Sequence, residues 1–131
     1  MKKPVIIQFE ADDNYVTVVD LIAFNMGLEI NAVASSVKQA KALFEQIESG
    51  KLKPEIVIVS SFLQKNHLDG KQVAEKIRQL SPKAKIIAYS VIPDTDWGDY
   101  LAIKSGKDTN KTLVQILVDL TGNDFNMDNS G

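Results

Sequence analysis

The fold of this chain is decided by the stretch Pro54-Glu55-Ile56-Val57-Ile58-Val59-Ser60-Ser61, a short apolar run that stops at two hydroxyl residues. Residues 56–59 are all β-branched, with no polar residue between them. Such a run predicts a strand covered on both faces, as in the parallel sheets of α/β proteins. Functional sites in open α/β sheets form just beyond the carboxyl ends of the strands, so we expect a site near Ser60 and Ser61.

Length and composition predict one soluble intracellular domain. The 131 residues fit a single folding unit. The chain has no cysteine, and its one histidine, His67, excludes a multi-histidine metal site. The formal net charge is −2 and the basic residues are scattered, which predicts no nucleic-acid partner. No apolar stretch has the length of a secretory signal or a membrane span, so we expect no membrane association and a cytoplasmic protein.

Strand and helix patterns alternate along the first two thirds of the chain. Apolar runs predict strands at 5–9, 29–34, 56–59 and 85–89. The segments between them carry apolar residues at spacings of three and four, which is typical of helices with one buried face. This alternation predicts a parallel sheet with right-handed crossovers.

The helix ends carry their own signals. Gly27 and Gly50 are placed to end the first and second helices in the left-handed conformation. Ser36 with Gln39 predicts a capping box at the start of the second helix. The third helix opens at 69–72 (Asp-Gly-Lys-Gln), after a segment, 61–68, whose composition predicts a loop.

The stretch 91–107 allows two interpretations. In the first, residues 99–104 form a fifth strand, which leaves too few residues before it for a full crossover helix. In the second, a helix begins near Asp94 and ends at Gly106, and the fifth strand is missing. We favour the strand.

Asp108 or Thr109 is predicted to cap a last helix, which ends at Gly122. Its apolar stripe consists of Leu113, Ile116, Leu117 and Leu120. Residues 123–131 are too polar to pack, so we expect a domain over 1–122 and a flexible tail or linker over 123–131.

Several of these features occur in one order that is similar to a known family. Pro54-Glu55 precedes the third strand, Asp69-Gly70 opens the third helix, Ser81-Pro82 precedes a fourth strand that ends at Ser90, and Gly27 closes the first helix. The chain thus resembles the receiver domain of two-component response regulators over nearly its whole length. This resemblance implies a flavodoxin-like three-layer α/β/α fold with a five-stranded parallel sheet of order 2-1-3-4-5. Here the fourth helix is shortened or the fifth strand irregular.

The resemblance also implies a phosphorylation site. In the family, an acidic pair after the first strand holds a divalent cation, and an aspartate ending the third strand accepts the phosphoryl group. Counting along this sequence places Glu10, Ala11 and Asp12 at the acidic positions, and a slip of one residue offers Asp12 and Asp13 instead. Ser60 falls at the phosphoacceptor position.

Two further family positions have counterparts. Ser90 matches the hydroxyl that ends the fourth strand, and Lys104 corresponds, out of register, to the lysine that ends the fifth. A serine hydroxyl, unlike an aspartate carboxylate, needs a neighbouring base to act as a nucleophile. Nothing near Ser60 in the sequence supplies that base, so we expect no catalytic residue and no enzyme activity.

Magnesium binding is doubtful for the same reason. Mg²⁺ requires several oxygen ligands, with carboxylates carrying the charge, whereas Ser60 is neutral and Ala11 offers no ligand. We therefore predict no cofactor and a weak or absent cation site at Glu10, Asp12 and Asp13. The other interpretation of these acids is that they cap the following helix and favour its dipole.

The aromatic residues Trp97 and Tyr100 are candidate partner contacts, because aromatic side chains are enriched in interface hot spots, although burial under the last helix is an alternative. His67 is predicted to be a surface residue, and Ser60-Ser61 lacks the glycine-rich turn of phosphate-binding loops.

These observations predict a pseudo-receiver, a phosphorylation-independent signalling module that acts through protein contacts. The expected partners are a histidine kinase, an output domain or a second copy of the chain. One alternative is a small-molecule or nucleotide binder or enzyme with the flavodoxin-like architecture. Another is a receiver that is phosphorylated at a non-standard residue.

Overall fold

The computed structural model of the chain describes residues 3–60, 62–64, 68–91, 96–104 and 109–124. These residues form a five-stranded parallel sheet of order β2-β1-β3-β6-β7 and a separate antiparallel hairpin of β4 and β5. The strands are β1 (Ile6–Phe9), β2 (Ile30–Ala34), β3 (Ile56–Ser60), β4 (Phe62–Gln64), β5 (Leu68–Asp69), β6 (Lys85–Ser90) and β7 (Tyr100–Ile103). The helices are α1 (Asp13–Asn25), α2 (Val37–Glu48), α3 (Gly70–Leu80) and α4 (Thr109–Thr121).

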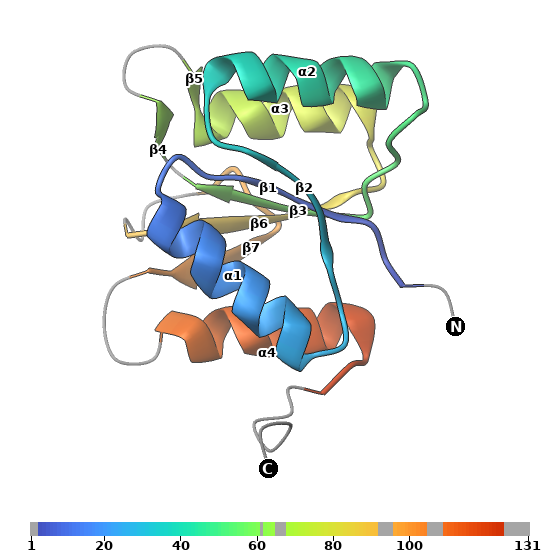
Figure 1. Ribbon diagram of the computed structural model, residues 1–131. Helices are drawn as coiled ribbons and strands as arrows, with labels where there is room; N and C mark the ends of the chain where they lie inside the picture. The colour runs from blue at the N-terminus through green and yellow to red at the C-terminus, as the bar shows by residue number, and fades with distance from the viewer. Residues whose placement is uncertain (1–2, 61, 65–67, 92–95, 105–108, 125–131) are drawn as a thin grey trace.

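The sheet lies between two helical layers (Figure 1). Helices α2 and α3 cover one face, and α1 and α4 cover the other. Strand β3 lies at the centre of the sheet, and all five of its residues are buried. Its side chains alternate between the two apolar clusters, Val57 and Val59 on the α2 and α3 side and Ile56 and Ile58 on the other. The prediction of a strand covered on both faces is thus confirmed, as is the sheet order.

The helix ends are built largely as predicted. Gly27, Gly50 and Gly122 adopt positive φ angles of 70°, 84° and 75° at the ends of their helices. At the start of α3, Asp69 Oδ1 accepts a hydrogen bond from the Gln72 N–H at 2.8 Å, and Gln72 Oε1 accepts from the Asp69 N–H at 3.0 Å. This reciprocal pair fixes the first turn of the helix.

Two local predictions need correction. Ser36 is the N-cap of α2 and accepts from the Gln39 N–H at 3.2 Å, but the Gln39 side chain accepts from the N–H of Ser35, so the predicted capping box does not close on Ser36. The segment 61–68, predicted as a loop, contains strand β4 and the first residue of β5. These strands are too short for hydrophobic periodicity to reveal them.

The stretch 91–107 contains the predicted fifth strand. Strand β7 pairs in parallel with β6 in an unbroken register from Ile87↔Tyr100 to Ser90↔Ile103. The described residues between the two strands, Val91 and Asp96–Asp99, form bends and turns and contain no helix. The alternative helix from Asp94 to Gly106 is therefore wrong, because its central residues lie in the sheet.

The last described residues remain attached to the packed domain. Asn123 Nδ2 donates a hydrogen bond to the Met26 carbonyl at 2.8 Å, just past the end of α1. The packed part of the chain thus includes Asn123, one residue beyond the predicted domain end at 122. Within the described residues, no helix combines the length and the apolar character needed to cross a bilayer.

Candidate functional site

A pocket of about 620 Å³ opens at the carboxyl ends of β1, β3, β6 and β7. Its lining consists of residues 10–15, Ser60, Ser90, Val91 and Lys104. The structure therefore brings together every predicted site residue except Trp97 and Tyr100. Residues Ser61 and His67 lie outside the described part of the chain.

A buried ion pair occupies the floor of this pocket. The Lys104 ammonium group pairs with Glu10 Oε1, and the two residues are only 8% and 2% exposed. Lys104 Nζ also donates a hydrogen bond to Ser60 Oγ at 3.2 Å. The Lys104 N–H donates to the Ser90 carbonyl at 2.7 Å, which continues the pairing of β7 with β6 beyond the last strand residue. Lys104 thus reaches the pocket although its spacing in the sequence is out of register with the family.

Two tyrosines complete the surroundings of the ammonium group. Lys104 Nζ lies 4.2 Å from the centre of the Tyr15 ring and 5.4 Å from that of Tyr89. The rings meet edge to face, with centroids 5.7 Å apart. Aromatic faces attract cations, and this attraction is strongest where water is excluded. The sequence marks Tyr15 only as a core residue of a helix and Tyr89 only as a strand residue, so neither contact was predicted.

Burial shifts the acid–base behaviour of this cluster. Loss of solvent raises the pKa of the Glu10 carboxyl above its usual 4.5, and the Lys104 ammonium offsets part of that effect. Burial also raises the pKa of Tyr89 to about 12, with smaller contributions from Tyr15 and Glu10. Among the described residues, the Tyr89 hydroxyl and both amide atoms of the buried Gln8 have no hydrogen-bond partner. Some buried polar atoms of β1 and β6 are therefore not satisfied by hydrogen bonds within the described residues.

The acidic residues after β1 are engaged in contacts within the protein or lie at the start of α1. Glu10 is engaged by Lys104, and Ala11 lines the pocket without offering a ligand. Asp12 is the N-cap of α1, and its Oδ1 accepts from the Asn14 N–H at 2.9 Å. Asp13 lies in the first turn of that helix. Within the described residues, no group of three or more histidine, cysteine, aspartate or glutamate side chains is placed to hold a metal ion, and weak or absent cation binding at Glu10, Asp12 and Asp13 stays a prediction.

Asp69, the nearest acidic residue beyond Ser60 in the described sequence, has a structural role. Its carboxylate caps α3 through the hydrogen bond from the Gln72 N–H. It is also absent from the lining of the pocket. A substitute phosphoacceptor at Asp69 would have to leave this capping position.

Trp97 packs on the face of the sheet opposite to Tyr15 and Tyr89. It is half-buried against the apolar residues of the α2 and α3 side, and its ring lies beside Gly70 at the start of α3. A Cβ atom at Gly70 would lie 2.7 Å from Trp97 Cζ2, so only glycine fits there. Tyr100 packs against the α1 and α4 side. Trp97 is therefore not buried under the last helix, and its role as a partner contact stays a prediction.

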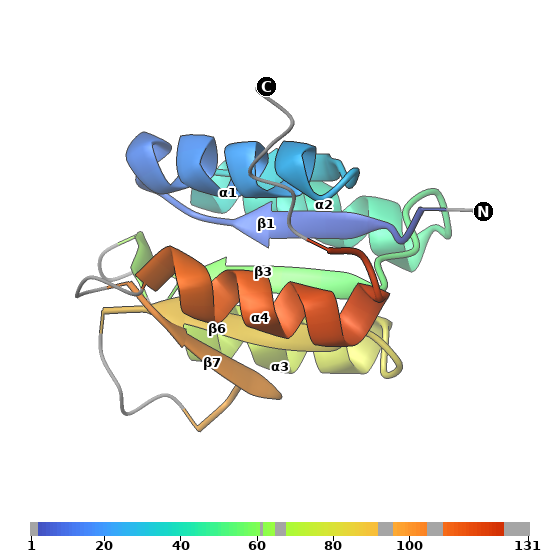
Figure 2. The same cartoon turned by 90° about the horizontal axis from the view of Figure 1, so that it is seen from below.

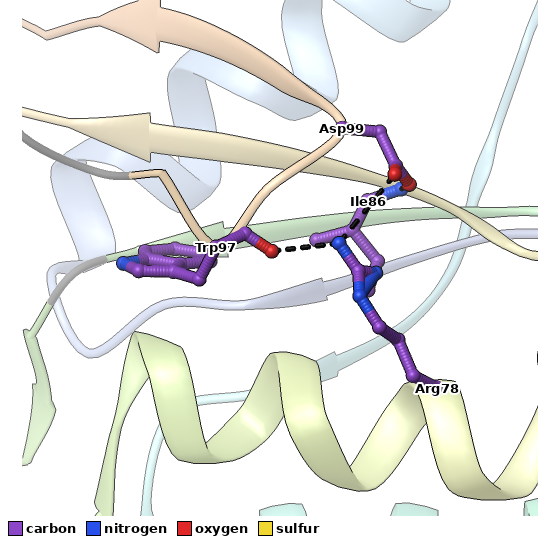
Figure 3. Close-up of polar contacts among 4 residues, drawn as sticks. All are labelled: Arg78, Ile86, Trp97 and Asp99. Atoms are coloured by element: carbon purple, nitrogen blue, oxygen red, sulfur yellow. Dashed lines mark hydrogen bonds and ion pairs between the residues drawn. The ribbon is translucent and has the colours of Figure 1, made fainter.

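The connection that carries Trp97 is held by polar contacts (Figure 3). Arg78 Nη2 donates to the Trp97 carbonyl at 2.7 Å and pairs with Asp99 Oδ1 at 3.4 Å. Asp99 Oδ2 accepts from the Ile86 N–H at 2.8 Å, and the Asp99 N–H donates to the Ile86 carbonyl at the same distance. These contacts anchor the start of β7 to both β6 and α3.

Known proteins resemble this chain in structure rather than in sequence. No family model matches the sequence, and no curated protein is similar enough to count as a relative. A CheY-like response regulator receiver domain protein from Methanospirillum hungatei is 16% identical, with 90% of this chain and 93% of that chain covered and a TM-score of 0.71.

Two other solved structures are equally similar. The phosphorylated cyanobacterial phytochrome response regulator RcpA is 13% identical, with 91% of this chain and 94% of that one covered and a TM-score of 0.74. A chain of the CheX–CheY–BeF3–Mg²⁺ complex from Borrelia burgdorferi is 15% identical, with 91% and 89% covered and a TM-score of 0.71. At these identities the likeness concerns the fold alone. The chain has the fold of the response-regulator receiver domains of two-component signalling.

Proposed function

We propose that this chain is a pseudo-receiver, a signalling module that acts by protein contact and without phosphorylation. One observation carries the proposal: the residue at the end of the central strand that faces the pocket is Ser60, and Lys104 Nζ donates a hydrogen bond to its hydroxyl oxygen. In the receiver fold this position belongs to the aspartate that accepts the phosphoryl group.

The chemistry of a hydroxyl supports a loss of the phosphorylation reaction. A carboxylate is ionised at neutral pH and attacks a phosphorus atom directly, whereas a serine hydroxyl needs a base to remove its proton. Among the described residues, the charged groups that contact Ser60 do not supply one. Lys104 is a hydrogen-bond donor to Ser60, and Glu10 is paired with that same lysine.

The buried ion pair also supports independence from a cation. In a receiver the acidic residues after the first strand hold the metal, but here the Lys104 ammonium already neutralises Glu10. Binding Mg²⁺ at Glu10 would separate this pair and leave the ammonium group buried without its counter-ion. An uncompensated buried charge costs about 3–5 kcal/mol. The Glu10 carboxylate is therefore neutralised by a group of the protein itself, which supports signalling without a metal.

The surface from Val91 to Leu120 is the proposed contact region, because it differs most from the receiver pattern. The described residues of the β6–β7 connection contain no helix, and Val91 is half exposed. One structural neighbour comes from a complex that contains both CheX and CheY, which is consistent with action through a protein partner. A histidine kinase, an output domain or a second copy of this chain would fit this mode of action.

Phosphorylation can be tested by intact mass. The protein is incubated with a small-molecule phosphodonor and Mg²⁺, and a receiver that retains its aspartate serves as the positive control. We expect no mass increase for this chain under conditions that phosphorylate the control. An acid-labile phosphoryl adduct on the chain would refute the proposal and favour a receiver phosphorylated at a non-standard residue.

The variant Ser60→Asp separates loss of the nucleophile from loss of the cation site. We expect this variant to stay unphosphorylated as well, because Lys104 would still neutralise Glu10 and Ala11 offers no ligand. An acyl phosphate on Ser60→Asp would show that the cation site had survived the loss of the aspartate.

A second candidate function is binding of a small molecule. The pocket volume of about 620 Å³ lies in the range of ligand sites, which is about 300–1,000 Å³. A thermal-shift series with nucleotides, flavins and phosphate would separate this function from the first. Stabilisation that rises with ligand concentration would favour a ligand-binding protein.

A further inference from the structure

Strand β7 is an open edge of the sheet. It pairs with β6 alone, and no strand of the described chain lies on its other side. In Figure 2 it forms the margin of the sheet beside α4, which packs against one of its faces, and no helix lies beyond its outer side. The Lys104 N–H points to β6, where it bonds the Ser90 carbonyl. Because backbone groups alternate in direction along a strand, those of Leu101 and Ile103 point away from β6, toward the open side.

This edge lacks the usual protection against pairing with another chain. Exposed edges are normally blocked by charged side chains, proline or a bulge. Residues 100–103 (Tyr-Leu-Ala-Ile) contain none of these, and their register with β6 is unbroken. The flanking charges are turned away, since Asp99 contacts Arg78 and Ile86, and Lys104 is buried in the pocket. The opposite edge differs, because the pairing of β2 with β1 contains a register shift and Asn31 is exposed there.

Two apolar side chains accompany the open backbone. Tyr100 and Ala102 pack in the cluster on the α1 and α4 side. Because side chains alternate across a strand, Leu101 and Ile103 lie on the opposite face, where both are only partly buried. The described residues of the β6–β7 connection contain no helix that would cover them. Pairing at this edge would therefore bury apolar area as well as satisfy backbone groups.

We propose that β7 pairs antiparallel with the β7 of a second copy of this chain, so that the two sheets become continuous. A two-fold axis through Ala102 places Leu101 of each copy opposite Ile103 of the other, with their outward backbone groups hydrogen-bonded. These opposite residues are apolar, so the strand is complementary to itself and no like charges meet. This inference deepens the proposed function by naming its partner, and its test measures association rather than phosphorylation.

Association is measured by light scattering on a sizing column and by sedimentation, over a wide range of protein concentration. We expect a concentration-dependent doubling of the mass. Leu101→Lys adds a charge at the edge and Ile103→Pro removes an outward donor, and each should weaken association at least about tenfold. Far-ultraviolet circular dichroism checks that both variants stay folded.

The matched control is Phe24→Lys, which places the same charge on an exposed apolar residue of α1 that is 72% accessible. This control should associate like the wild type. A chain that remains monomeric at every concentration overturns the proposal, even if the chain binds some other protein. A dimer that survives both edge variants, or that dissociates in Phe24→Lys, also overturns it.

Amide hydrogen exchange gives a second, residue-resolved readout. The N–H groups of Leu101 and Ile103 should exchange more slowly as the protein concentration rises, because they become bonded only between copies. The N–H of Ala102 points toward β6 by the same alternation, so its exchange should depend little on concentration. The reverse pattern, or equal slowing at all three amides, would contradict pairing through this edge.

Discussion

A single side chain, Lys104, holds the pocket together. Its ammonium group contacts the Glu10 carboxylate, the Ser60 hydroxyl and the faces of two tyrosine rings. A charge removed from water is costly unless such partners replace its hydration. The cluster is therefore best regarded as one unit, in which each group compensates for the burial of another.

Removal of the lysine alone should be strongly destabilising. Lys104→Met leaves the Glu10 carboxylate buried without its counter-ion, and we expect the free energy of unfolding to fall by about 3–5 kcal/mol. The double variant Lys104→Met/Glu10→Gln should recover most of this loss, since no charge then remains buried. Denaturant unfolding measures both values. Lys38→Met changes an exposed lysine of α2 and serves as the control. It should change the free energy of unfolding by no more than about 0.5 kcal/mol. Equal effects at the two lysines would contradict the ion-pair unit.

The raised pKa of Tyr89 predicts a loss of stability in alkali. Its value is about 12 in the folded chain against 10.0 for an ordinary tyrosine. Between these two values the unfolded chain releases its proton first, so stability falls as the pH rises from 10 to 12. The loss should be on the order of 2 kcal/mol. Tyr89→Phe should show a shallower decline in denaturant unfolding over this range, and an identical decline would contradict the assignment.

The sequence predicts the residues of the pocket better than their contacts. Glu10, Ser60, Ser90 and Lys104 each stand at or just after the end of an apolar run, so a parallel sheet must bring them to one edge. The sequence does not reveal that Lys104 pairs with Glu10, because that contact joins strands at separate positions in the sheet. The ring of Tyr15 above the ammonium group is likewise set by the packing of α1.

At the scale of elements, the connection between β6 and β7 is unusual. Parallel strands are normally joined by about a dozen or more residues that include a helix. Here nine residues, 91–99, separate the two strands, and among the described ones Trp97 packs against the α2 and α3 side while Asp99 bonds to β6. A Cβ atom at Gly98 would lie 2.9 Å from that of Ala88, which shows how closely the connection approaches β6. The described part of this connection is thus packed closely against the sheet without a helix.

The polar contacts of this connection should contribute unequally. Asp99→Ala leaves the buried Ile86 N–H without its acceptor, and we expect a loss of about 1–3 kcal/mol in unfolding free energy. Arg78→Ala should cost less than about 1 kcal/mol, because the Arg78 and Asp99 side chains are 42% and 38% exposed and water screens their charges. Chemical denaturation of both variants gives the comparison. A larger effect at Arg78 would show that the ion pair, rather than the backbone contact, anchors β7.

Elements with strong patterns were predictable, and those shaped by neighbours were not. The apolar runs and the glycines at 27, 50 and 122 were sufficient to place most strands and helix ends. Asn31 weakens the pattern of β2, yet its Oδ1 accepts from the Ile6 N–H at 2.8 Å, beside the register shift between β1 and β2. A polar residue that replaces a backbone acceptor in this way has no signature in the sequence.

At the scale of the whole molecule, the order of the strands decides which side chains can come into contact in the pocket. Glu10 follows β1 and Lys104 follows β7, with β3 and β6 between these strands. The long lysine side chain spans that gap and passes Ser60 at the end of β3. The alternation of strands and helices predicted the parallel sheet, and the resemblance to receiver domains implied the layers and the strand order. The length of one side chain, in contrast, decides how the pocket is filled.

The position of Trp97 has a practical consequence. This residue is the only tryptophan of the chain, and its indole rests on the start of α3 beside Gly70. Intrinsic tryptophan fluorescence therefore has a single origin, at the junction between the β6–β7 connection and the helix. Emission from the native protein thus reports, without an attached dye, whether the indole ring still packs against the start of α3.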